Sequence, residues 1–211
     1  MFTIYVYVLE TLADWELGYV TSELHSGRFF KKDAERVSLK TVSYSKEPIH
    51  TMGGLTVIPD CLIEDMVVSE TSVLLLPGAD TWNDHRHDTI IEKAGEFLAI
   101  GATVEAICGA TAALANFGLL DNRRHTSNGQ GVLEMFSPAY KGQRFYIDEP
   151  SVADHNLITA NSAGSLLWAK QIIARLGVFR SDTLEFWYAY FNTGKAESFF
   201  ALMGSLQGKD F

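Results

Sequence analysis

A cysteine stands at a sharp transition in the sequence. The mostly apolar run Thr103–Ile107 precedes Cys108, and the small residues Gly109–Thr111 follow it. The first stretch is typical of a buried strand and the second of a helix that begins at once. Such a turn exposes the side chain at its corner, as in the nucleophile elbow of serine hydrolases. A sulfur at the first turn of a helix is favoured as thiolate, so we expect a nucleophile rather than a buried structural cysteine.

A second motif supplies hydrogen-bond donors. The apolar run ending at Leu76 is followed by Pro77-Gly78-Ala79-Asp80. Glycine permits a turn in which backbone N–H groups point toward a bound oxyanion. We expect the amides of Gly78, Ala79 and Gly109 to form an oxyanion hole. The alternative is a simple turn at the end of a strand.

A carboxylate follows the first apolar run. Asp14 is a plausible N-cap for a helix, and Glu16 lies in its first turn. A carboxylate there stabilises the helix end electrostatically. The functional interpretation is that Glu16 points at Cys108, where it tunes the thiol pKa or shuttles a proton.

These residues need a scaffold that brings them to one edge. Apolar, β-branched runs predict strands over Phe2–Leu9, Val37–Tyr44, Ser72–Leu76, Thr103–Ile107 and Leu157–Ala160. Helical spacing alternates with them over Asp14–Ser26, Asp88–Ile100, Ala110–Phe117, Ser165–Leu176, Asp182–Asn192 and Ala196–Leu206. This alternation predicts an α/β fold with one doubly wound, mostly parallel sheet between helices, as in flavodoxin. A hairpin or an excursion at the edge of the sheet is expected at residues 50–59, and the pattern gives no assignment for residues 128–150.

Length and charge narrow the class of protein. One domain over residues 1–211 is expected. The formal charge of -9 disfavours nucleic acid and anionic membrane as partners. No stretch resembles a signal peptide or a membrane span, and Cys61 and Cys108 lack metal-ligand spacing. We therefore expect a cytoplasmic protein that acts on a small molecule, without a cofactor or a metal.

The motifs together resemble the ThiJ/PfpI superfamily, which has the class I glutamine amidotransferase-like fold. The resemblance rests on the order and spacing of ADWE, MGGLTVIPD, LPGAD, AICGAT, GLLDNRRHTSN and NLITANSAG. It implies a homodimer in which Cys108 is reactive, Glu16 hydrogen-bonds to it, and Gly78 and Gly109 supply the oxyanion donors. Members include cysteine hydrolases, glyoxal-handling lyases, isonitrile hydratases, chaperones and oxidative-stress sensors.

The chain departs from the family pattern at the histidine. Many members carry it directly after the cysteine, where this chain has Gly109, and others at the position that aligns with Asn128. His125 precedes Asn128 by three residues, so on a strand it should face the other way. The loop of Asp80, Trp82 and His85 could line the pocket, with His85 as a substitute base. The alternatives are a solvated loop or a weak His85-x-His87 metal site.

Three functions fit these observations. The first is a cysteine-dependent hydrolase or lyase acting on a small electrophile, with a low Cys108 pKa. The second is a redox or stress-response module whose Cys108 is oxidised to sulfenic or sulfinic acid. The third is a binding module with an inert cysteine. The densely aromatic C-terminal helices either pack on the core or form a pocket wall or dimer surface.

Overall fold

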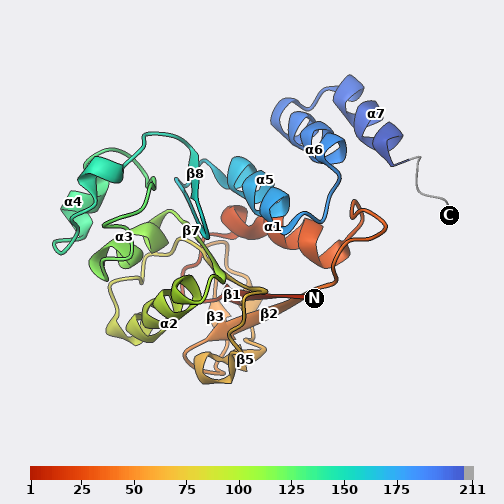
Figure 1. Cartoon of the computed structure of the whole chain (residues 1–211). Coiled ribbons are helices and arrows are strands. Elements are labelled where there is room, and N and C mark those ends of the chain that lie inside the picture. The colour runs from red at the N-terminus through yellow and green to blue at the C-terminus, as the bar shows by residue number, and fades with distance from the viewer. Residues whose placement is uncertain (207–211) are drawn as a thin grey trace.

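A seven-stranded sheet forms the centre of the computed structural model, which describes residues 1–206 (Figure 1). Its strands are β1 (Phe2–Tyr7), β2 (Val37–Ser43), β5 (Cys61–Leu62), β6 (Ser72–Leu76), β7 (Thr103–Ile107), β8 (Ser151–Asp154) and β9 (Leu157–Ala160). Their spatial order is β5-β2-β1-β6-β7-β9-β8, and every pair is parallel except β8 with β9. The predicted α/β fold with a mostly parallel sheet is confirmed.

Helices cover both faces of this sheet. They are α1 (Asp14–Ser26), α2 (Asp88–Ala99), α3 (Gly109–Asn116), α4 (Val132–Phe136), α5 (Ser165–Leu176), α6 (Ser181–Thr193) and α7 (Ala196–Ser205), with 3₁₀ turns η1 (Ile63–Asp65), η2 (His85–His87) and η3 (Gln143–Phe145). Helices α1 and α5 pack together on one face, and α2 and α3 lie against β6 and β7 on the other (Figure 1). Because both faces are covered, every residue of β6 and β7 is buried.

The strand order explains why the predicted site residues meet. Strands β1, β6 and β7 are neighbours, with Val6 beside Leu75 and Leu75 beside Glu105. The chain leaves the carboxyl end of β1 toward α1, that of β6 toward η2 and α2, and that of β7 toward α3. In open α/β sheets, ligands bind beyond these carboxyl ends, where the connections diverge.

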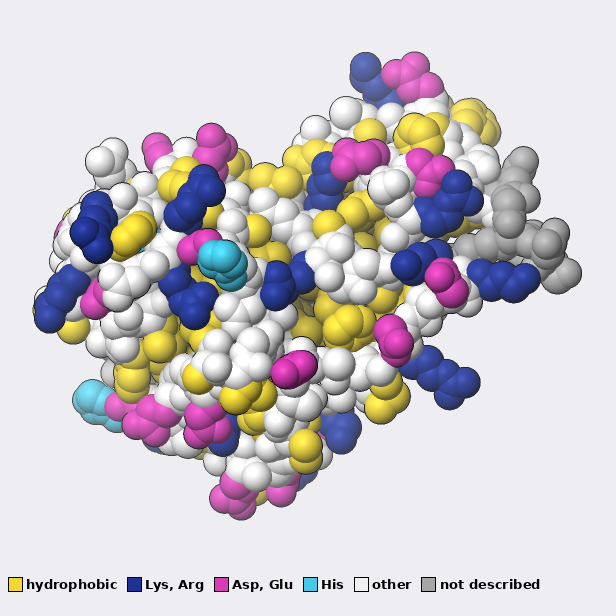
Figure 2. All heavy atoms as spheres, viewed as in Figure 1, with side chains coloured by type: hydrophobic (Ala, Val, Ile, Leu, Met, Phe, Trp, Pro, Cys, Tyr) yellow, Lys and Arg dark blue, Asp and Glu magenta, His cyan; other side chains and the backbone are white. Residues whose placement is uncertain are grey.

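The aromatic C-terminal helices divide between core and surface. Helix α6 packs on α5, and α7 packs on α6. Trp187 is fully buried, and its Nε1 donates to Glu23 Oε1 of α1 at 3.0 Å. Phe199 and Phe200 remain exposed, and Figure 2 shows apolar side chains among charged ones over these two helices. Core packing is thus confirmed for Trp187 and not for the outermost phenylalanines.

The irregular segments contain the features that the sequence left open. The predicted hairpin is present as β3 (Ile49–His50) and β4 (Thr56–Val57). Residues 128–150, unassigned from sequence, contain the short α4 and η3. None of the helices within residues 1–206 combines the length and apolar character that crossing a bilayer requires. The expected homodimer and cytoplasmic location stay predictions.

Candidate active site

Cys108 occupies a strained corner between β7 and α3. Its backbone has φ 58° and ψ -126°, a region that side-chain-bearing residues rarely adopt. Such a conformation costs about 1–3 kcal/mol and persists only where the surroundings impose it. Here the N–H of Cys108 donates to Ala160 O of β9 at 2.9 Å, which holds the corner. The predicted elbow is therefore present, with the side chain of Cys108 partly exposed.

Small residues make this corner possible. Ala106 and Ala110, on either side of Cys108, are fully buried. A β-carbon added at Gly109 would lie 3.1 Å from Ala79 O and 3.2 Å from Trp82 Cδ1, closer than ordinary contact. Glycine at position 109 thus lets the loop after β6 close over the beginning of α3.

Glu16 lies against Cys108, held there by Gly78. Its carboxyl is fully buried, and Oε2 accepts the Gly78 N–H at 2.6 Å. A β-carbon added at Gly78 would lie 2.8 Å from Cys108 Cβ and 2.8 Å from both Glu16 carboxylate oxygens. Only glycine fits this gap, so its function is to let the acid and the cysteine approach each other.

The same contact corrects the expected role of Gly78. Its N–H is engaged by Glu16 and does not face a substrate oxyanion. The N–H of Gly109 faces the Cys108 thiol, and no acceptor among the described residues takes the N–H of Ala79. The N–H groups of Ala79 and Gly109 are thus the candidates that remain for the expected oxyanion hole.

The pKa values of Glu16 and Cys108 are both raised in the folded protein. Burial raises the pKa of Glu16 above its usual value, against the lowering effect of the Gly78 N–H and the Cys108 side chain. Burial also raises the pKa of the Cys108 thiol, and the adjacent Glu16 adds to this increase. The low Cys108 pKa expected from the helix N-terminus is therefore not found. Two buried anions side by side are unfavourable, so the pair keeps a proton near neutral pH.

Asn128 approaches the sulfur from another direction. Its Oδ1 accepts the N–H of Ser162 at 2.9 Å, and its Nδ2 lies 3.2 Å from Cys108 Sγ. Because a backbone N–H can only donate, Ser162 fixes which end of the amide points at sulfur. The hydrogen bond from Asn128 lowers the pKa of Cys108, in opposition to burial and Glu16.

A buried hydroxyl network supports the elbow from beneath. Thr111 Oγ1 donates to Cys108 O at 2.6 Å. The same oxygen lies 2.7 Å from Ser127 Oγ, and with its own proton committed it accepts from Ser127. This network ties the elbow to the segment that carries Asn128.

Cys108 opens into a hollow of about 430 Å³. Loop residues Asp80, Trp82 and Asn83 form one wall, together with Ala79. Helix α3 and the α4 region complete the lining with Gly109, Ala112, Ala113, Asn116, Ser127, Asn128, Val132 and Phe136. Trp82 is fixed in place because its Nε1 donates to Pro77 O at 2.8 Å. The predicted positions of Asp80, Trp82 and Asn128 therefore converge on the cysteine.

The histidines lie elsewhere. The His85 side chain is 95% exposed, pairs with Asp88 Oδ2 at 2.9 Å, and is absent from the lining of the Cys108 hollow. This corrects the expectation of a histidine base at residue 85. His87 is buried against Tyr7 OH at 2.7 Å. His125 is fully buried between Arg123 O and Tyr140 OH, facing away as predicted. Within residues 1–206, no three potential ligand side chains gather into a metal site.

The sequence matches the model of a known protein family. The DJ-1/PfpI family model matches residues 2–175. The chain belongs to the DJ-1/PfpI family. It is 43% identical over 203 residues to a Bacillus subtilis protein called an uncharacterized protease, YoaZ, covering 96% of this chain and 97% of that one. A second B. subtilis uncharacterized protease, YdeA, is 28% identical over 180 residues, covering 84% of this chain and 85% of that one.

Solved structures of DJ-1/PfpI proteins share the fold. A thiJ/pfpI family protein from Bacillus anthracis superimposes with a TM-score of 0.94 at 45% identity, covering 97% of this chain and 98% of that one. A DJ-1 superfamily protein from Agrobacterium tumefaciens gives a TM-score of 0.78 at 26% identity, covering 90% and 100%. The α6–α7 hairpin lies beyond the residues that the family model matches.

Three residues of this DJ-1/PfpI site, Ser162, Val132 and Phe136, were not predicted from the sequence. Ser162 follows the carboxyl end of β9 in NSAG, a position that parallels Gly78 after β6. That placement was the available signal for its role in orienting Asn128. Val132 and Phe136 lie on the five-residue α4, which is too short to show helical periodicity.

Proposed function

We propose that this DJ-1/PfpI protein is a cysteine-dependent hydrolase or lyase in which Cys108 attacks the carbonyl carbon of a small electrophile. The observation that carries the proposal is the position of one sulfur at a strained elbow, between a buried acid and a fixed amide, at the edge of a hollow. This geometry supplies a nucleophile, a proton acceptor and space for a small molecule. A histidine is not required.

The proposed reaction begins with Glu16 as general base. As Cys108 Sγ bonds to the carbonyl carbon, the thiol proton passes to Glu16, whose Oε1 has no hydrogen-bond partner among the described residues. The raised pKa of Glu16 makes it a stronger base than an exposed carboxylate. The carbonyl π electrons move to oxygen, which Ala79 and Gly109 N–H groups stabilise.

Collapse of this adduct completes the reaction. In a hydrolase, the carbonyl re-forms, the leaving group departs with the proton from Glu16, and water releases the acyl group from sulfur. In a lyase acting on an aldehyde with an adjacent carbonyl, a proton shift from carbon to carbon converts the thiohemiacetal into a hydroxy thioester. Water then cleaves its C–S bond, which releases the hydroxy acid and restores the thiol. Formation of the first C–S bond at Cys108 is common to both.

Acyl transfer from p-nitrophenyl acetate tests this step. We expect release of p-nitrophenolate and an acetyl group mapped to Cys108 by mass spectrometry. Cys108→Ala should abolish the acetylation, while Cys61→Ala should leave it unchanged, because Cys61 lies half-buried at β5 away from the hollow. An equal rate of ester cleavage in Cys108→Ala and wild type would refute the proposal.

A second candidate is a peroxide-responsive redox module. The donors around Cys108, Asn128 Nδ2 and the Gly109 N–H, are suited to hydrogen-bond an oxygen added to sulfur. In that reaction a thiolate attacks peroxide, giving a sulfenic acid and releasing hydroxide. Selective oxygen addition at Cys108 under mild peroxide, with no acetylation by the ester, would favour it over the hydrolase or lyase. If Cys108 reacted with neither the ester nor peroxide, the function that remains would be that of a binding module.

A further inference from the structure

The Cys108 hollow is lined by acidic and neutral side chains and by no basic ones. Its lining is entirely within the described residues and includes no lysine, arginine or histidine. Asp80 supplies a carboxylate at the rim, and the buried carboxyl of Glu16 lies beside Cys108. The other polar side chains in the lining are uncharged, namely the amides of Asn83, Asn116 and Asn128 and the hydroxyl of Ser127.

Asp80 is held in this position by its backbone. Its N–H donates to Thr11 Oγ1 at 2.9 Å, which anchors the loop after β6 to the loop after β1. No ion pair or hydrogen bond from within residues 1–206 engages the Asp80 carboxylate. Its charge is therefore not neutralised locally, and an anionic ligand in the hollow would meet it directly.

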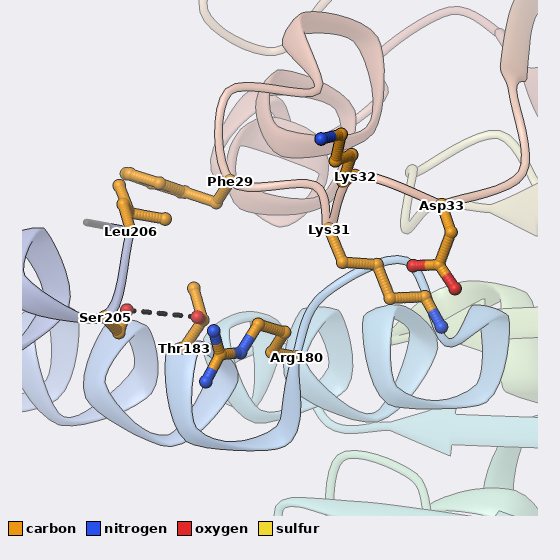
Figure 3. A pocket seen from close by; sticks show the side chains of 8 residues that line it. All are labelled: Phe29, Lys31, Lys32, Asp33, Arg180, Thr183, Ser205 and Leu206. Atoms are coloured by element: carbon orange, nitrogen blue, oxygen red, sulfur yellow. Dashed lines mark hydrogen bonds between the residues drawn. The ribbon is translucent and has the colours of Figure 1, made fainter. Parts of the chain in front are cut away.

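Cations are gathered at another hollow of the same protein. That hollow, of about 210 Å³, is lined by Lys31, Lys32 and Arg180 between the α1–β2 loop and α6 (Figure 3). Figure 3 shows Lys32 directed away from the other two, and Arg180 pairs with Asp182 at 2.9 Å. These cations neither converge on a ligand position nor line the Cys108 hollow, so the hollow at the cysteine has no counter-charge for an anion.

We propose that the Cys108 hollow selects electrophiles without negative charge, either neutral or cationic, and rejects those bearing a carboxylate, sulfonate or phosphate. This inference rests on the proposed function, because it assumes that Cys108 reacts there. The apolar side chains of Val132, Phe136 and Trp82 provide contact for the uncharged part of such a molecule. A free amino acid such as glutamine, whose carboxylate would need a cation, is excluded by the same argument.

Methanethiosulfonates that differ in charge test the selection. In each reaction the thiolate attacks the sulfenyl sulfur, forming a mixed disulfide and releasing methanesulfinate. The three reagents carry a neutral hydroxyethyl, a cationic trimethylammonioethyl or an anionic sulfonatoethyl group, and the comparison that decides is between the two charged reagents, which are both bulkier than the neutral one. Rates are measured by intact mass in Cys61→Ser protein, so that Cys108 is the reacting thiol, and each is divided by the rate with 2-mercaptoethanol.

The normalised rate with the cationic reagent should be about ten times that with the anionic reagent, or more, because an unpaired carboxylate nearby attracts the cation and repels the anion. Asp80→Asn should lower the ratio several-fold, and Asp80→Lys should invert it. The matched control Asp33→Asn removes the same net charge far from the hollow and should leave the ratio unchanged. A ratio near one in the parent, or an equal response to Asp33→Asn, overturns the charge selection. Failure of all three reagents to modify Cys108 refutes the nucleophilic cysteine itself, which separates the two failures.

Discussion

The amide nitrogen of Asn128 lies 3.2 Å from the sulfur of Cys108. Asn128 donates a hydrogen bond that favours the thiolate, whereas it cannot accept the thiol proton. Asn128→Asp preserves the acceptor for Ser162 but replaces the donor with an anion. We expect iodoacetamide to alkylate Cys108 about tenfold more slowly at pH 8, because each unit of thiol pKa changes the thiolate fraction tenfold.

The control for this variant is Asn116→Asp. Asn116 lines the same hollow and gains the same charge, but its amide donates to Phe136 O and not to the sulfur. We expect a much smaller change in the alkylation rate there. Equal slowing in both variants would show that general electrostatics, and not the Asn128 hydrogen bond, controls the thiol.

Glu16 raises the pKa of Cys108 and is also the proposed general base, and one substitution distinguishes these two effects. In Glu16→Gln the adjacent negative charge disappears, so the pKa of Cys108 should fall from its raised value. The pH midpoint for iodoacetamide alkylation then moves downward, and the rate at pH 8 rises about 3- to 30-fold. The same variant loses the general base, so ester cleavage should fall about 100-fold or more.

The alkylation and ester-cleavage rates of Glu16→Gln should thus change in opposite directions. Unfolding of the site would also expose the thiol to alkylation and abolish ester cleavage, so an unchanged melting temperature is the control that the fold is intact. Wild-type ester cleavage should also decline as acid protonates Glu16, beginning above the usual carboxylate pKa of 4.5 because burial raises it. A Glu16→Gln enzyme with unchanged ester cleavage would remove Glu16 from the mechanism.

Gly78 is predicted to tolerate no side chain. The β-carbon of Gly78→Ala would fall 2.8 Å from Cys108 Cβ and the Glu16 oxygens, so backbone or acid must move. We expect a loss of about 1–3 kcal/mol in the free energy of unfolding, together with loss of ester cleavage. Thermal and denaturant unfolding measure the first, and the p-nitrophenol assay the second.

Gly18→Ala provides the matched control for that substitution. Gly18 lies within α1, and an added β-carbon there meets no atom within 4 Å. Alanine should stabilise the helix by up to about 1 kcal/mol, because glycine loses more backbone entropy on folding. Loss of stability in both variants would mean that the steric argument at Gly78 is wrong.

The sequence predicted the features that depend on local pattern. Continuous apolar runs identified the strands. The small residues around Cys108 identified the elbow, because a tight turn requires small side chains at positions next to it in the sequence. The likeness of its motifs to the ThiJ/PfpI superfamily is confirmed by the family match. These features need no knowledge of the packing between distant segments.

The sequence could not predict the features that depend on packing between segments. Gly78 follows a strand like any turn glycine, and only the approach of α1 shows that its N–H is used by Glu16. His85 follows the expected strand, but the 3₁₀ turn η2 places it in solvent beside Asp88. The balance of burial against the helix N-terminus at Cys108 likewise depends on how closely the elbow is covered.

Glu105 is a buried acid that the proposed mechanism does not use. It lies in the middle of β7, flanked by Leu75 and Ile158, and neither carboxylate oxygen has a hydrogen-bond partner among the described residues. Burial raises the pKa of Glu105 well above the usual value, with only partial opposition from Arg175. The folded state therefore binds this proton more tightly than the unfolded state does.

This difference sets the sign of a pH effect on stability. The contribution of Glu105 is fully present below its unfolded pKa, near 4.5, and is lost as pH rises toward its folded pKa. Glu105→Gln should therefore raise the melting temperature more at pH 8 than at pH 5, by several degrees for about 1–3 kcal/mol. The exposed Glu70→Gln variant should change little at either pH. A melting-temperature difference between Glu105→Gln and wild type that is the same at both pH values would contradict the raised pKa.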